Sequence, residues 1–129
     1  MSRTALDLSS QELKVYDPAG AIRRRQAFER QELARRRRKA LRVARQAAQL
    51  LRDEFGARRV VLFGSLAQPG QYTRLSDIDL AAWGILPERF FAAVASVTGL
   101  SSTFKIDLVD PESCRPGLQN AIEQRGKAL

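Results

Sequence analysis

The chain has 129 residues, with 22 Lys and Arg against 14 Asp and Glu, a formal net charge of +8, one cysteine and no histidine. This length suits one domain with a core of ordinary size, and a single cysteine excludes an internal disulfide. Without histidine, Ser-His-Asp and Cys-His catalysis and His-ligated zinc are excluded, so chemistry falls to carboxylates, hydroxyls, Lys, Arg and a bound metal.

The sequence predicts a cytoplasmic protein that makes no membrane contact. No apolar run approaches the roughly 20 residues that cross a bilayer, and the first residues lack the apolar core of a signal peptide. Residues 1–20 are expected to form an N-terminal arm, with a short helix over Gln11–Tyr16 because Ser9 and Glu12 have the spacing of a capping box. Asp17-Pro18-Ala19-Gly20 is expected to break this helix.

Residues 21–56 predict one long Arg-rich helix. No Pro or Gly interrupts Ala21 to Phe55, and good helix formers dominate its composition. Gly56 follows as the expected C-cap. A helix places the apolar residues of the second half on one face, namely Leu41, Ala44, Ala48, Leu51 and Phe55. We expect this half to pack on the domain and the first half to project or to meet a partner.

Basic charge is concentrated in this helix. Residues 23–59 hold 14 Arg and Lys against four acids, a net +10, and the remainder of the chain sums to −2. A solvated helix face, contact with nucleic acid through residues 23–45, and docking on an acidic protein all agree with such a stripe. Nucleic acid is not the favoured partner.

Three strands are expected in the remainder, residues 57–129. Val60–Phe63 forms the first and runs into Gly64-Ser65, Ser76–Ala82 forms the second, and Phe104–Val109 forms the third. Between the last two, Pro87 begins a helix whose apolar residues are expected in a core or an interface: Phe90, Phe91, Val94, Val97 and Leu100. A last short helix is expected over Leu118–Arg125, after which residues 126–129 finish the chain.

The second strand carries Asp77 and Asp79, which a strand places on the same face. Two adjacent carboxylates repel each other, and a fold keeps them mainly when a cation lies between them. Gly64 at a strand end lets a phosphate approach bare backbone, and Ser65 offers an N–H and a hydroxyl. With Asp107 on the third strand, the pattern indicates chemistry on a metal-bound nucleoside triphosphate.

This ordered set resembles the minimal nucleotidyltransferase (MNT-type) family of the DNA polymerase β-like nucleotidyltransferase superfamily. The matching residues are Gly64-Ser65, the two aspartates of Ser76-Asp77-Ile78-Asp79-Leu80, and Asp107. The resemblance covers roughly Phe55 to the C-terminus. It implies an α/β (α+β) fold: a small sheet of three or four strands with helices, preceded by the long basic helix.

The resemblance also implies a reaction: transfer of AMP from ATP to a hydroxyl, with release of pyrophosphate. Gly64 and Ser65 would hold the β- and γ-phosphates, Asp77 and Asp79 would bind Mg²⁺, and Asp107 would bind a second Mg²⁺ and accept the acceptor's proton. Many members read Gly-Ser-x-Ala-Arg-Gly, whereas this chain has Gln68 at the arginine position. Arg74 and Lys105 are the candidate substitutes.

MNT-type proteins are commonly antitoxins of HEPN ribonuclease toxins and can adenylylate a toxin tyrosine. We therefore expect an antitoxin that modifies a cognate HEPN toxin. The Arg-rich helix is expected to contribute to binding of this toxin. Three alternatives remain: neutralisation by binding alone, transfer to a small molecule, and action on nucleic acid. Cys114 and Trp83 are expected to have structural roles only.

Overall fold

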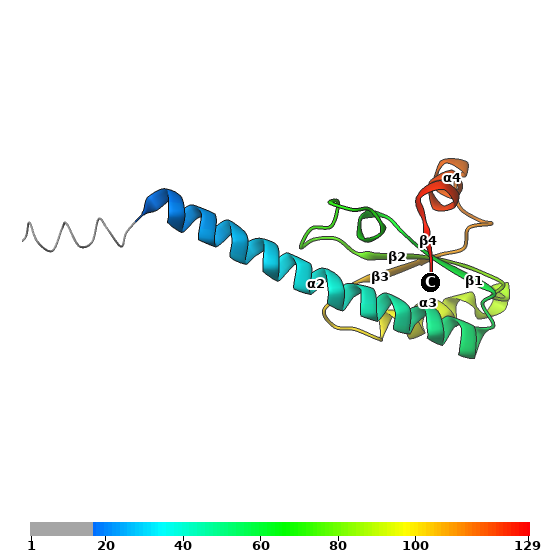
Figure 1. Ribbon diagram of the computed structural model, residues 1–129. Helices are drawn as coiled ribbons and strands as arrows, with labels where there is room; N and C mark the ends of the chain where they lie inside the picture. The colour runs from blue at the N-terminus through cyan, green and yellow to red at the C-terminus, as the bar shows by residue number, and fades with distance from the viewer. Residues whose placement is uncertain (1–16) are drawn as a thin grey trace, which may run out of the picture. The chain divides into compact units, whose positions relative to one another are not determined.

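The structure is a computed structural model that describes residues 17–129 (Figure 1). The chain divides into two compact units, of which the first reaches Ala34 and the second runs from Arg35 to Leu129. The helix expected over Gln11–Tyr16 lies outside the described residues, and the boundaries expected at residues 20 and 56 stay predictions. Among the residues described, no helix combines the length and apolar character needed to cross a membrane.

The long basic helix is present as α2, Pro18–Phe55. It begins three residues before the expected Ala21, because proline is well tolerated in the first turn of a helix, where its missing N–H has no partner to lose. The Asp17 carbonyl accepts a hydrogen bond of 2.7 Å from the Ala21 N–H and closes this first turn. In the first unit, Ile22 and Phe28 are more than half exposed.

The second half of α2 packs on the core, as its apolar stripe predicts. Five of its residues are almost completely inaccessible to solvent: Ala40, Ala44, Ala47, Ala48 and Leu51. Leu41, which the stripe included, is only partly buried. Because most of the buried positions are alanines, the helix backbone can lie close to the sheet. Gly56 ends the helix at a φ of 72°, the left-handed conformation typical of a helix C-terminus.

A four-stranded mixed sheet has the order β3-β2-β1-β4. Strand β1 (Arg59–Phe63) pairs antiparallel with β2 (Ile78–Trp83), and β2 pairs parallel with β3 (Ile106–Val109). The parallel pair is joined through α3 (Phe90–Thr98), the usual helical crossover between parallel strands. This architecture confirms the predicted fold class.

Helices cover both faces of the sheet (Figure 1). The part of α2 after Ala34 and α3 lie on one side, and α4 (Pro116–Arg125) lies on the other. On the α4 side, Ile122 packs on Val61 and Ala81. Because side chains alternate along a strand, Asp79 lies on the same face as Ala81, and Asp107 on the same face as Val109, which borders this cluster.

Strands β2 and β3 begin two residues later than the sequence predicts, so Asp77 precedes β2 and Lys105 precedes β3. Hydroxyl groups order both loops. The Ser76 Oγ accepts from the Thr73 N–H at 2.9 Å, and the Ser101 Oγ accepts from the Phe104 N–H at 3.1 Å. These local bonds satisfy backbone groups in place of a longer ladder.

Two further features differ from the expectations. Phe91 on α3 is 86% exposed, and Ala93 takes the buried position together with Val97, so Phe91 does not belong to the core, and its expected place in an interface stays a prediction. The sequence also gave no indication of β4 (Lys127–Ala128), which pairs antiparallel with β1. The Arg52 guanidinium donates to the Leu129 carbonyl next to this strand.

Leu51→Ala should lower the free energy of unfolding by about 2–5 kcal/mol, because it leaves a cavity where the fully buried Leu51 side chain packs. Leu75→Ala is the matched control, since the Leu75 side chain is 92% exposed and surface changes stay within about 0.5 kcal/mol. Urea unfolding followed by circular dichroism measures both. Equal losses in the two variants would contradict the packing of α2 on the sheet.

Candidate active site

One end of the sheet collects the predicted glycine and two of the three predicted carboxylates. Phe63, the last residue of β1, pairs with Asp79 on β2, and Asp79 pairs with Asp107 on β3. Gly64 follows Phe63 directly. Asp79 therefore lies between the end of β1 on one side and Asp107 on the other, and all three positions belong to adjacent strands.

Gly64 makes a sharp turn against Asp79. Its φ of 74° and ψ of −162° form a conformation that is essentially restricted to glycine. A Cβ built on Gly64 would overlap the Oδ2 of Asp79, so no side chain fits here even without backbone strain. Ser65 begins a short 3₁₀ helix, Ser65–Ala67, directly after the turn. The bare backbone of Gly64 thus touches the central carboxylate of the site.

Asp77 reaches the same end of the sheet from the loop before β2. The Ile78 N–H that follows it donates to the Lys105 carbonyl at 2.9 Å, which fixes the start of β2 against the start of β3. The Asp77 side chain is partly buried, as are those of Asp79 and Asp107. Asp77 lies outside the strand, so the expected strand alternation does not determine its position. The turn closed by Thr73 and Ser76 holds it at this end of the sheet instead.

Burial and like charges destabilise the ionised form of Asp79. Partial burial, followed by the negative charges of Asp107 and Asp77, raises the pKa of Asp79 to about 6, above the ordinary value of an aspartate, while the Lys105 ammonium lowers it. Asp79 is therefore close enough to the other two carboxylates to feel their charge. A cation bound beside Asp79 would relieve both the desolvation and the repulsion.

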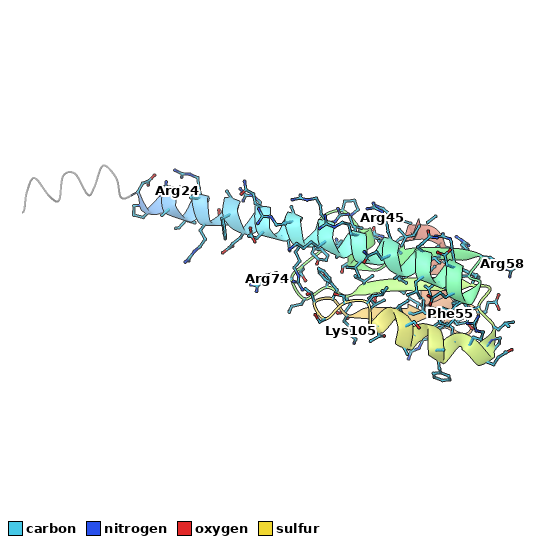
Figure 2. All side chains as sticks on the ribbon, turned by 90° about the horizontal axis from the view of Figure 1, so that it is seen from below. Arg24, Arg45, Phe55, Arg58, Arg74 and Lys105 are labelled. Atoms are coloured by element: carbon cyan, nitrogen blue, oxygen red, sulfur yellow. The ribbon has the colours of Figure 1, made fainter. Side chains whose placement is uncertain are left out.

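The two predicted phosphate-binding cations have different surroundings. The Lys105 Nζ lies 3.8 Å from the Asp107 Oδ1, an ion pair whose side chains are 69% and 43% exposed. Arg74 is exposed on the loop between the 3₁₀ helix and β2. Figure 2 shows Arg74 and Lys105 on loops at the end of the second unit that lies away from Arg58. Both cations therefore occur at the end of the sheet that carries the carboxylates.

A cavity of about 500 Å³ adjoins the Gly64-Ser65 turn on the α4 side. Its lining includes Gly64, Ser65, Gln68, Leu118 and Arg125. Neither Arg74 nor Lys105 contributes to it. No motif in the sequence indicated Arg125 as a site residue, although its place in the last turn of the predicted final helix marked a basic residue there.

The carboxylates suit Mg²⁺, although they do not form a ready-made cage. In residues 17–129, no three Asp, Glu or Cys side chains are arranged to hold one ion between them. Magnesium usually takes only one or two carboxylates, with waters and phosphate oxygens as its other ligands. Over the same range, no N–H or O–H group donates a hydrogen bond to the Asp79 carboxylate, so its oxygens stay free to act as ligands.

No known family profile matches the sequence, and no curated protein matches it. Solved structures do. A toxin–antitoxin solved with AMP-PNP is 27% identical over 66% of this chain and 70% of that chain, with a TM-score of 0.54. A toxin–antitoxin MntA–HpeT with a tyrosine-to-alanine substitution is 27% identical over 66% and 69%, with a TM-score of 0.53.

A second MntA–HpeT structure, with two aspartate-to-glutamate substitutions, is 24% identical over 66% of this chain and 70% of that chain, with a TM-score of 0.53. At this identity the match shows the fold alone. MntA is a nucleotidyltransferase antitoxin of the MNT type. The structural likeness therefore agrees with the resemblance that Gly64-Ser65 and the three aspartates carry.

Gly64→Ala and Gly70→Ala form a matched pair that tests the contact between the turn and Asp79. Both glycines have a φ of 74°, but a Cβ on Gly70 would have no neighbour within 4 Å. Backbone strain should cost Gly70→Ala about 1 kcal/mol. Gly64→Ala should lose roughly 1–3 kcal/mol more, because its ψ of −162° adds to the strain and because Asp79 must move. Urea titration measures the difference, which should shrink in an Asp79→Ala background.

Asp79→Asn should change how stability depends on pH in metal-free buffer. Because the folded protein raises this pKa to about 6, folding binds a proton, and wild-type stability falls as the pH rises from about 4 to about 7. The asparagine variant lacks this titration, so its Tm should exceed the wild-type Tm at pH 7 by a few degrees at most, given that solvent screens the carboxyl. The difference should vanish near pH 4, whereas exposed Glu112→Gln should show no such trend.

Proposed function

We propose that this chain is a nucleotidyltransferase antitoxin that transfers AMP from Mg²⁺-bound ATP to a tyrosine hydroxyl of a cognate HEPN ribonuclease toxin and so neutralises it. The observation that carries the proposal is the pairing of Asp79 with Asp107, next to a Gly64-Ser65 turn that admits no side chain. The likeness to a toxin–antitoxin solved with AMP-PNP supports the nucleotide and the kind of partner.

The Gly64-Ser65 turn is the phosphate-binding part of the site. Its bare backbone permits close approach of phosphate oxygens, and the N–H and hydroxyl of Ser65 are suitable donors. Donors that are held in place by the fold stabilise developing negative charge without reorganisation. The positive-φ turn at Gly64 keeps these donors oriented, because the end of β1 and Asp79 adjoin it from two sides.

The carboxylates divide the remaining work. Asp77 and Asp79 would hold Mg²⁺, whose charge offsets that of the triphosphate. Asp107 would take the proton of the acceptor hydroxyl, whose oxygen forms a bond to the α-phosphorus while the bond from the α-phosphorus to the β-phosphate oxygen breaks. Pyrophosphate leaves with that oxygen. The Lys105 Nζ lies 3.8 Å from the Asp107 Oδ1 and forms an ion pair with this carboxyl.

A second candidate function is neutralisation by binding alone, without catalysis. The observation that favours it is Gln68, which stands where related proteins have an arginine and whose amide is already engaged, donating to the Arg125 carbonyl at 3.1 Å. A chain that had lost affinity for nucleotide would still cover a toxin. Catalysis and binding alone make opposite predictions for a variant that lacks the carboxylates.

The test is to incubate the protein with Mg²⁺, ATP labelled on its α-phosphate, and the toxin encoded beside it. Label should appear on a toxin tyrosine, located by mass spectrometry. Asp77→Ala/Asp79→Ala should reduce labelling by more than about 100-fold, because both ligands of the triphosphate-bound metal are lost. Chelation with EDTA should have the same effect.

Asp53→Ala/Glu54→Ala is the matched control, since it removes two exposed acids of α2 and should leave labelling unchanged. Toxin labelling that survives the loss of Asp77 and Asp79 would overturn the assignment of these residues. Absence of any labelling by the wild-type protein, together with full neutralisation of the toxin by the Asp77→Ala/Asp79→Ala variant, would establish the binding function instead.

A further inference from the structure

The turn that is proposed to bind phosphates lacks a local arginine, and Gln68 does not replace it. Gln68 follows directly after the 3₁₀ helix and borders the same cavity as Gly64 and Ser65. Its amide nitrogen donates to the Arg125 carbonyl, 57 residues further along the chain. This bond links the turn to the last residue of α4. Because the neutral amide is already used in this bond, Gln68 is a weak phosphate ligand.

Arg125 is the one residue with a positively charged side chain in the lining of this cavity. Its side chain is exposed and makes no ion pair among the described residues. Two other arginines of the second unit are engaged elsewhere. Arg59 pairs with Glu123 at 3.1 Å, and Arg89 lies over the Phe55 ring at 4.7 Å. The Arg125 guanidinium is therefore available to a ligand in the cavity.

We propose that Arg125 binds the triphosphate of the nucleotide, supplying from the end of α4 the positive charge that Gln68 does not supply at the turn. The inference rests on the proposed function and adds a substrate-binding residue to it. The cavity of about 500 Å³ has Ser65 and Arg125 in the same lining, so a polyphosphate seated on the turn meets a fork of N–H donors that can bind two of its oxygens at once.

Gln68 acts in this arrangement as a positioning residue. Its hydrogen bond to the Arg125 carbonyl holds the C-terminal turn of α4 at the cavity, while Ile122, one turn earlier, anchors the same helix on Val61 and Ala81. The two contacts fix the Arg125 backbone from both sides. Gln68, in place of the family's usual arginine, thus holds Arg125 at the cavity, and Arg125 supplies the positive charge.

The experiment measures binding of Mg²⁺-ATP and of inorganic tripolyphosphate by isothermal titration calorimetry. Arg125→Ala should weaken the binding of both ligands by about 10- to 100-fold, which corresponds to one lost charge-assisted contact. Arg125→Lys should retain part of the affinity, since it keeps the charge but loses the fork. Circular dichroism should be unchanged in both variants, because the side chain is exposed.

Arg115→Ala is the matched control. Arg115 is an exposed arginine at the opposite end of α4, so its loss changes net charge equally and should leave both affinities unchanged. The rescue variant Arg125→Ala/Gln68→Arg moves the positive charge to position 68, which lines the same cavity. It should recover most of the affinity for tripolyphosphate, which a purely structural role of Arg125 does not predict.

The outcomes separate the inference from the function on which it rests. If the wild-type protein binds both ligands and Arg125→Ala binds them equally well, Arg125 has no role and only the inference fails. If Arg125→Ala weakens ATP but not tripolyphosphate, Arg125 contacts the nucleoside, and the assignment to the triphosphate is wrong. If the wild-type protein binds neither ligand, the proposed transferase function fails and takes the inference with it.

Discussion

The backbone of Gly64 and the carboxylate of Asp79 occupy adjoining space, and the rest of the site depends on that contact. The register of β1 against β2 brings them together, and the register of β2 against β3 then sets Asp107 on the other side of Asp79. A shift of either register by one residue would send the carboxylates to the opposite face of the sheet. Burial on both faces prevents such a shift.

The two faces of the sheet do different work. On one face, the alanine-rich part of α2 and α3 bury the large apolar residues that stabilise the fold. On the other, α4 covers only the middle of the sheet through Ile122, and the charged end is left to solvent and ligand. The placement of α4 thus creates the cavity beside Ser65, which Leu118 and Arg125 of this helix help to line.

Much of this arrangement could be predicted from the sequence. The apolar stripe of α2, the strand before Gly64 and the alternation around Asp107 all reflect local periodicity, and each corresponds to an observed element. What could not be predicted depends on contacts between distant residues. Arg125 lines the cavity beside Ser65 because Ile122 packs α4 on the sheet and Gln68 donates to the Arg125 carbonyl. The strand β4 pairs with the free edge of β1. Phe91 fits a helical apolar pattern yet faces outward.

The contact between Gly64 and Asp79 also constrains how such a site changes over evolutionary time. A side chain at position 64 is sterically incompatible with the aspartate, so mutation at 64 is tolerated only after position 79 has become smaller. Position 79 faces no reciprocal barrier, because a smaller residue there merely leaves space. A lineage in which the carboxylate is no longer required would therefore lose the aspartate first and the glycine later, and a homologue with the glycine but not the aspartate would mark the intermediate stage.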